Sequence, residues 1–207
     1  MTNKYLIIFL VLILSIQTYA AGKVFSDASA RVEISAETSN SYTIVFETKN
    51  LLPQQVQFAG NSNDMLLLPD EGMLLEQGRP MLPSVSRFVI VPADKALEFS
   101  YQVESSHEVS GANLPLLFDE EDAGIILGQN FGGYEYYPPV AAIMSEPIII
   151  RGVRMVKITT YPVQYNAAAN TYLINEGIET RINYVDGEPI NPVMRPNRRN
   201  RSVHFKN

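Results

Sequence analysis

Residues 97–104 read LEFSYQVE, a stretch in which apolar and polar side chains alternate strictly. A period of two is typical of a β-strand that has one face in the core and the other in water. Residues 178–184, IETRINY, repeat the same alternation. The two stretches therefore predict long strands in sheets with one packed and one solvated face.

Shorter segments of β type lie around these two stretches. Residues 31–48 contain two more alternating runs, and residues 84–91 and 148–161 are rich in β-branched side chains between prolines. Residues 165–170, YNAAAN, predict a hairpin connection. Thirteen Pro and twelve Gly mark turns, and helical periodicity is nowhere sustained over three turns. The expected fold is all-β, an antiparallel β-sandwich or jelly-roll-like single domain that follows a leader.

The first twenty residues have the organisation of a secretory signal peptide. Residues 1–4 carry one positive charge, residues 5–16 are almost continuously apolar, and small residues precede a cleavage point between Ala20 and Ala21. A membrane anchor is the alternative, but the run is shorter than the roughly 20 residues that a spanning helix needs. We expect a secreted protein, periplasmic or extracellular, without membrane association after cleavage.

Charge and composition exclude several classes of function. Residues 21–194 contain all 22 acidic residues and ten of the 16 basic ones, and such an acidic body is unsuited to nucleic acid. The sequence has no Cys and two His, His107 and His204. It offers no thiolate nucleophile and too few His for a His-rich metal site. We predict no catalytic residues, no cofactor and no metal.

Residues 110–147 interrupt the strand pattern. They combine the acidic run 119–122 with four glycines between 124 and 133 and a tyrosine-rich group at 134–137, and no Lys or Arg occurs between Lys95 and Arg151. A connection of this length is often functional. It is either a partner-facing loop or a further pair of strands, for which residues 125–127 are a candidate.

Three segments, taken in order, suggest a family. They are GRPMLP at 78–83, RGVRMVKI at 151–158 and YPVQYN at 161–166, the last followed by a closing strand. In this order and spacing the sequence resembles the propeptide of gingipain-type cysteine peptidases, peptidase family C25. The pattern covers residues 72–185, and the flanking strands extend it over most of the chain.

The resemblance implies a function without catalysis. Propeptides of this family are intramolecular chaperones and latency inhibitors that cover the active-site cleft of a caspase-like cysteine peptidase domain, the expected partner in cis or in trans. The catalytic Cys of the family belongs to that domain, and this chain has no Cys. The chain is then a fragment of a longer precursor, a truncated reading frame or a free-standing propeptide-like protein.

The resemblance also suggests which residue reaches the cleft. A propeptide of an Arg- or Lys-specific enzyme is expected to offer a basic side chain, but residues 110–147 contain none. Arg79 is the candidate, because Pro80 makes the bond that follows it a poor substrate. The alternative is an ordinary surface turn at Gly78 and Pro80. Arg151 and Arg154, three residues apart on an expected strand, are assigned to opposite faces and to pairing with acids.

The end of the chain is expected to be a linker. We divide the sequence into a signal peptide at 1–20, a β-rich propeptide-like domain at 21–190 and a flexible basic tail at 191–207. The candidate processing sites in the tail are Arg198, Arg199 and Arg201, where a trypsin-like enzyme could cut. A solvated tail without such a role is the alternative.

A second function class stays open beside the propeptide. An exported β-sandwich can be a binding module for a glycan or a cell-surface protein. The tyrosines at 134–137 support it, because aromatic faces stack on sugars, although they serve equally well as core or as a loop anchor.

Overall fold

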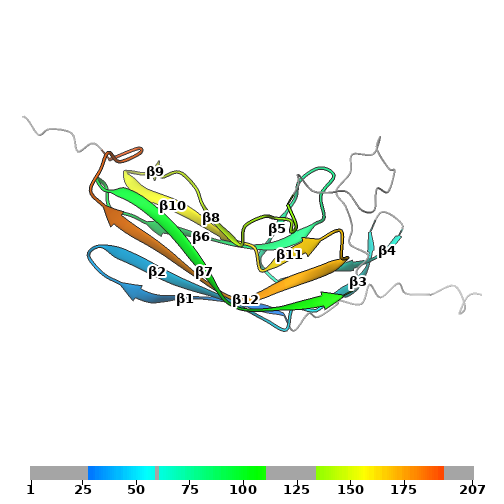
Figure 1. The fold of residues 1–207 in the computed structure, drawn as a ribbon. Coiled ribbons are helices and arrows are strands. Elements are labelled where there is room, and N and C mark those ends of the chain that lie inside the picture. Colours follow the sequence, from blue (N-terminus) through cyan, green and yellow to red (C-terminus); the bar gives the residue numbers. More distant parts are fainter. Residues whose placement is uncertain (1–27, 59–60, 111–133, 194–207) are drawn as a thin grey trace, which may run out of the picture.

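The computed structural model describes residues 28–58, 61–110 and 134–193. These ranges form twelve strands, all paired antiparallel, and none of their residues is helical (Figure 1). Among them there is consequently no helix long and apolar enough to cross a membrane. Ala20, Ala21, residues 119–122 and 125–127, and the tail arginines lie outside the described ranges.

The first sheet is built around one long strand. It comprises β1 (Ser29–Glu37), β2 (Ser41–Lys49), β12 (Thr171–Val185) and β11 (Val163–Asn166) in that order, with β7 (Ala96–Ser110) also paired to β12. The two stretches with the clearest alternation are direct neighbours, since Ile178 lies opposite Val103 and Ile182 opposite Phe99. The hairpin predicted at residues 165–170 is confirmed by the pairing of β11 with β12.

The second sheet has the order β5 (Gly72–Leu74), β6 (Leu82–Ile90), β10 (Val153–Thr160) and β8 (Ala142–Met144). A further short strand, β9 (Ile148–Ile150), also pairs with β10, and β3 (Gln54–Phe58) and β4 (Asn61–Met65) form a separate hairpin. The expectation of one strand over residues 148–161 was wrong. Arg151 and Gly152 have φ values of 52° and 79°, so a two-residue turn folds this segment into the β9–β10 hairpin.

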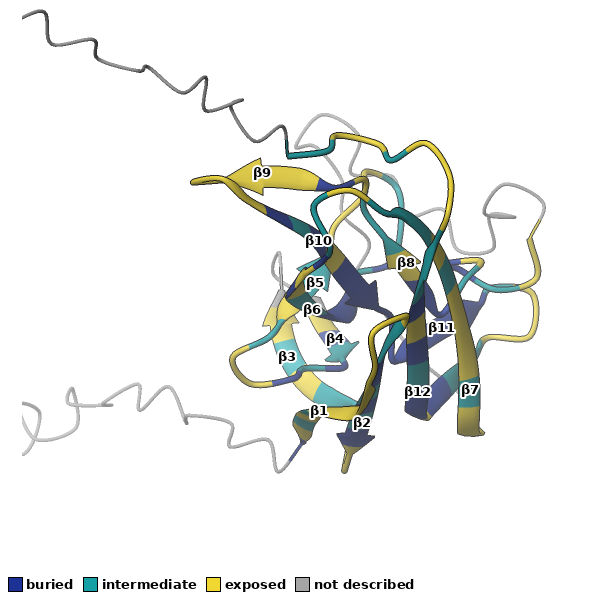
Figure 2. Ribbon diagram, turned by 90° about the vertical axis from the view of Figure 1, so that its left-hand side faces the viewer, coloured by how far each residue is buried: buried dark blue, intermediate teal, exposed yellow. Residues whose placement is uncertain are grey.

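A single hydrophobic cluster contains side chains from both sheets, as a β-sandwich requires. Phe46, Ile178 and Ile182 come from the first sheet, and Val156 and Ile158 from the second. Figure 2 shows the buried segments of the two sheets turned toward each other. Full burial of an aliphatic side chain contributes about 1.5–3 kcal/mol, so this shared core keeps the two sheets together. The predicted all-β antiparallel fold is confirmed.

Arg154 departs from the expectation that it pairs with an acid. Its side chain is 2% exposed. Nη1 donates to the carbonyl oxygens of Pro92, at 2.6 Å, and Lys95, at 2.9 Å, and Nη2 donates to that of Ile190, at 2.7 Å. Arg154 lies on the inner side of β10 with Val156 and Ile158, beside three backbone carbonyls, whereas Arg151 lies in the turn before the strand. Burial lowers the pKa of Arg154 from its ordinary value.

The described chain remains attached to the body beyond residue 190. Asn191 Nδ2 donates to the Pro147 carbonyl at 2.9 Å, and the Val193 amide donates to the Ala93 carbonyl at 3.0 Å. Residues 191–193, which the expected division assigned to the tail, are therefore held by hydrogen bonds to the sandwich.

We expect Arg154→Met to lower the free energy of unfolding by about 2–4 kcal/mol, because hydrogen bonds to a charged group contribute about 1.5–3 kcal/mol each and are not additive. Urea unfolding followed by circular dichroism measures the change. Arg181→Met is the matched control, because it makes the same change on β12 at a side chain that is half-exposed. A loss for Arg154→Met no larger than for the control would show that the carbonyl contacts do not stabilise the fold.

Candidate functional site

The residues that flank segment 111–133 come together at one end of the sandwich. On the upstream side, β7 ends at Ser110, which pairs with Thr171 of β12. On the downstream side, Tyr136 donates its hydroxyl hydrogen to Glu108 of β7, with 2.8 Å between the oxygens. The hydrogen bond raises the pKa of Tyr136 and ties the returning chain back to the strand that it left. We call this end of the sandwich, defined by Glu108, Tyr136, Tyr137 and Tyr165, the loop base.

Tyr137 anchors the loop base in the core. Its side chain is 4% exposed, and its backbone forms an isolated bridge with Tyr165 through hydrogen bonds of 2.9 Å and 2.7 Å. The next residue is held as well, because Gln164 Nε2 donates to the Pro138 carbonyl at 2.8 Å. Burial, and secondly a hydrogen bond with Glu76, raises the pKa of the Tyr137 hydroxyl well above its ordinary value.

Arg79 lies against this anchor. The central carbon of its guanidinium group is 5.4 Å from the centre of the Tyr137 ring, within the range of a cation–π interaction. The structure thus brings together two features that are separate in the sequence, the Arg79 turn and the downstream end of the long connection. Arg79 is half-buried, so the plain surface turn is an incomplete description of it.

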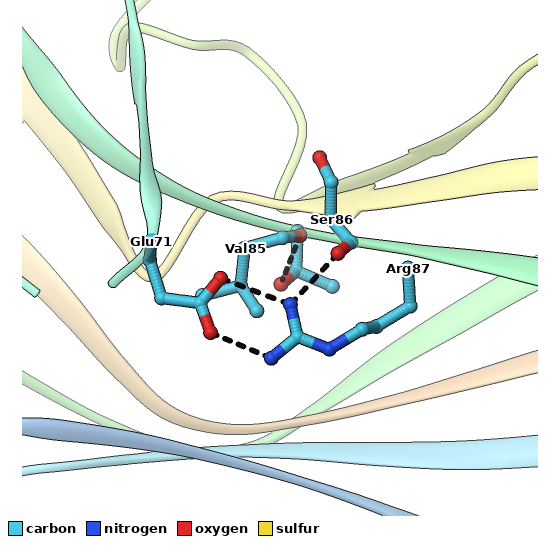
Figure 3. A network of polar contacts seen from close by, with 5 residues as sticks. Glu71, Val85, Ser86 and Arg87 are labelled. Carbon is cyan, nitrogen blue, oxygen red and sulfur yellow. Dashed lines mark hydrogen bonds and ion pairs between the residues drawn. The ribbon is translucent and has the colours of Figure 1, made fainter. Parts of the chain in front are cut away.

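Local interactions fix the turn that carries Arg79. Gly78 has a φ of 71°, a conformation that favours glycine, and the Arg79 amide donates to the Glu76 carbonyl at 3.0 Å. The segment before the turn is joined to β6 by a two-pronged ion pair, in which Arg87 Nη1 and Nη2 lie 2.9 Å and 2.6 Å from the Glu71 carboxylate oxygens (Figure 3). This hydrogen bonding raises the pKa of Arg87. A planar pair of this kind restricts orientation as well as distance.

The three tyrosines of residues 134–137 have different environments. Tyr134 is 61% exposed, Tyr136 is half-buried and bonded to Glu108, and Tyr137 belongs to the core. They do not form a shared exposed platform for a sugar. The loop-anchor interpretation of the cluster is the one that fits, and the glycan-binding module is not favoured.

Sequence reasoning missed the partners that build this site. Glu108 and Tyr136 are 28 positions apart, and Glu71 and Arg87 are 16 apart, so no short-range spacing links them. The described ranges contain no group of three or more His, Asp or Glu residues that could hold a metal ion. The arrangement is a turn and a loop base that lie together and are held by hydrogen bonds to the strands.

Comparisons with known proteins found a matching family model and similar proteins. The Propeptide_C25 family model matches residues 25–195. Gingipain R2 from each of two Porphyromonas gingivalis strains is 26% identical over 148 residues, which are 68% of this chain and 20% of the relative. The chain therefore spans about a fifth of the length of these curated relatives.

Two solved structures from Porphyromonas gingivalis share the fold. The complex of RgpB pro- and mature domains has a TM-score of 0.62 at 21% identity and covers 79% of this chain and 88% of that chain. A structure that addresses the zymogenic latency of gingipain K has a TM-score of 0.58 at 16% identity and covers 76% of this chain and 93% of that chain.

We expect Tyr137→Leu to lower the free energy of unfolding by about 2–4 kcal/mol, because it removes buried ring volume and the ring beneath Arg79. Tyr134→Leu, the same change at an exposed position, should stay within about 0.5 kcal/mol of the parent. Equilibrium unfolding in urea compares the two variants. Equal effects would show that Tyr137 does not anchor the loop base.

Proposed function

The chain belongs to the Propeptide_C25 family, and on that premise we propose that it is an exported propeptide, the chaperone and latency inhibitor of a gingipain-like cysteine peptidase. The observation that carries the proposal is the family match, which extends over nearly all of the β-rich body. The apolar leader supports export, with cleavage between Ala20 and Ala21. The proposed role is non-catalytic and needs neither a cofactor nor a metal.

The proposal assigns the loop base and the Arg79 turn to the peptidase cleft. A surface that blocks a cleft must resist deformation, since each side chain that has to be ordered on binding costs about 0.5–1.5 kcal/mol. The buried Tyr137, the Glu108–Tyr136 hydrogen bond and the Glu71–Arg87 pair supply this rigidity. In the proposal, Arg79 is the basic contact of this surface with the cleft.

Release of the peptidase is proposed to follow cleavage in the basic tail. Arg198, Arg199 and Arg201 lie beyond Val193, the last residue that the structure describes, in a stretch whose polar and basic composition is typical of a linker. An accessible segment is where proteolysis occurs first. Cutting there would separate the propeptide from a domain joined to it and leave the sandwich whole.

The test is inhibition in trans. The chain from Ala21 to Asn207 is titrated against each gingipain-type peptidase of the source organism, while mass spectrometry follows the fate of the chain. We expect stoichiometric loss of activity with one peptidase and cuts confined to Arg198, Arg199 and Arg201. Absence of both inhibition and complex formation with every peptidase would contradict the proposed function. Early cuts within the sandwich would contradict the proposed processing sites.

Arg79→Ala tests the cleft contact separately. We expect inhibition about tenfold weaker, because truncation of a central interface arginine often costs 1 kcal/mol or more. Arg181→Ala, at a half-exposed position of β12, should inhibit like the parent. Inhibition constants from progress curves give the comparison. If Arg79→Ala inhibits like the parent while the parent itself inhibits, Arg79 is a structural turn residue.

A further inference from the structure

The second sheet exposes an unusual share of the apolar side chains. Of the thirteen large hydrophobic side chains that are exposed in the described ranges, seven belong to this sheet. Contiguous apolar surface of this kind marks an interaction site more often than scattered single residues do. We call six of the seven the outer apolar face, and they are Phe88, Ile90, Ile143, Ile148, Ile150 and Val153.

Strand register shows that these side chains share one side of the sheet. Met155 of β10 lies between Ile90 of β6 and Ile148 of β9 in a single row across three strands. Val153 pairs with Ile150 in the row beyond. The alternate positions of β10, Val156 and Ile158, face the core and are fully buried. Phe88, Ile90, Ile148, Ile150 and Val153 are therefore neighbours, with Met155, on the side of the sheet away from the core, and Ile143 shares that side beyond the exposed Lys157.

The edge of this sheet is also open. Strands β8 and β9 both pair with β10. Between them, Ser145 continues the hydrogen bonding to β10: its amide donates to the Lys157 carbonyl, and its hydroxyl oxygen accepts from the Lys157 amide, each at 2.9 Å. The three isoleucines of β9 are 41%, 46% and 47% exposed, and the strand projects from the body (Figure 2). Exposed edges are usually protected by charge or proline. An edge of three isoleucines fits a surface that a partner covers.

The path of the chain indicates which partner reaches this surface. The Pro147 carbonyl, directly before β9, accepts from Asn191, and the Ala93 carbonyl, just after β6, accepts from Val193. The chain thus leaves the described structure beside β9, at the end of the sandwich where β12 finishes (Figure 1). Residues 194–207 carry five basic residues and few apolar ones, so they do not match the outer apolar face in composition.

We infer that the outer apolar face is a docking surface for the gingipain-like peptidase domain, separate from the contact at the cleft. The inference rests on the proposed function. A peptidase domain joined in cis would be connected to the chain beyond Asn191, which is bonded to Pro147 directly before β9, and a short tether gives an effective concentration of about millimolar for a second contact. The loop base lies at the opposite end of β7, whose fifteen residues extend about 50 Å at a rise of about 3.4 Å per residue. The two contacts together would hold a peptidase domain along the length of the sandwich.

Charge insertion tests the docking surface. Ile90→Lys and Ile150→Lys place an ammonium group on the outer apolar face, and Ile34→Lys is the matched control, an isoleucine on β1 in the other sheet that is 58% exposed. The probe is the peptidase domain inhibited in the preceding test, with its catalytic Cys changed to Ala. Biolayer interferometry gives the affinity, and light scattering gives the oligomeric state.

We expect each face variant to bind at least tenfold more weakly, mainly through faster dissociation, and Ile34→Lys to stay within twofold of the parent. Urea unfolding checks that the variants are folded, and Ile90→Thr and Ile150→Thr, which keep a β-branched side chain, replace any lysine variant that is not. Their expected loss is at least threefold.

Three outcomes would overturn the inference. Face variants that bind like the parent, while the parent inhibits, would leave the proposed function intact and remove this surface from it. A parent chain that binds no peptidase would overturn the proposed function and this occupant together. A parent dimer that only the face variants convert to monomer, with unchanged peptidase affinity, would assign the face to a second copy of the chain.

Discussion

The guanidinium group of Arg154 holds together the end of the sandwich at which the chain leaves the body. It bonds the segment that follows β6, through Pro92 and Lys95, to the segment that follows β12, through Ile190. A buried charge is costly unless hydrogen bonds compensate for it, and here three carbonyl groups accept from Nη1 and Nη2, while Nε has no hydrogen-bond partner among the described residues. Together with the Asn191–Pro147 and Val193–Ala93 hydrogen bonds, this side chain positions the exit of the chain beside the β9–β10 hairpin.

A second polar network connects the core to the loop base. The register of β12 shifts at Asn175 and Gly177, and at this irregularity the Asn175 side chain donates to Gln164 at 3.1 Å and to the Tyr161 carbonyl at 3.3 Å. Gln164 in turn donates to Pro138, directly after the buried Tyr137. These hydrogen bonds restrict the arrangement of the neighbouring strands, although Asn175 Oδ1 has no hydrogen-bond partner among the described residues. The loop base is thus held by hydrogen bonds that lead back to β12, the central strand of the first sheet.

The strands could be predicted where alternation was strict, and much of the remainder could not. The alternation in residues 97–104 and 178–184 predicted two strands with one packed face each. In the structure these two strands pair with each other. The run 148–150 was β-branched and apolar, which does not distinguish a buried strand from an exposed one, and it is exposed. Arg154 was expected to pair with an acid because the body is acidic, but its partners are the backbone carbonyls of Pro92, Lys95 and Ile190, which no sequence pattern identifies. Arg79 was selected from its turn and its charge, but the tyrosine beneath it is 58 positions away and no local pattern could identify it.

The loop base and the outer apolar face differ in how cleavage of the tail would affect their contacts with the peptidase domain. In the proposed mechanism, contact at the loop base is made by side chains that the sandwich orders on its own, so it would persist after the tail is cut. Docking on the outer apolar face would depend on the tether, because a covalent connection beside β9 sets the effective concentration of the peptidase domain at that face. Cleavage at Arg198, Arg199 or Arg201 would remove the high effective concentration that the tether provides. Of the two contacts, the one on the outer apolar face would then dissociate first. In the proposed mechanism, latency is therefore strong while the chain is continuous and becomes reversible once it is cut, without any change of fold in the propeptide.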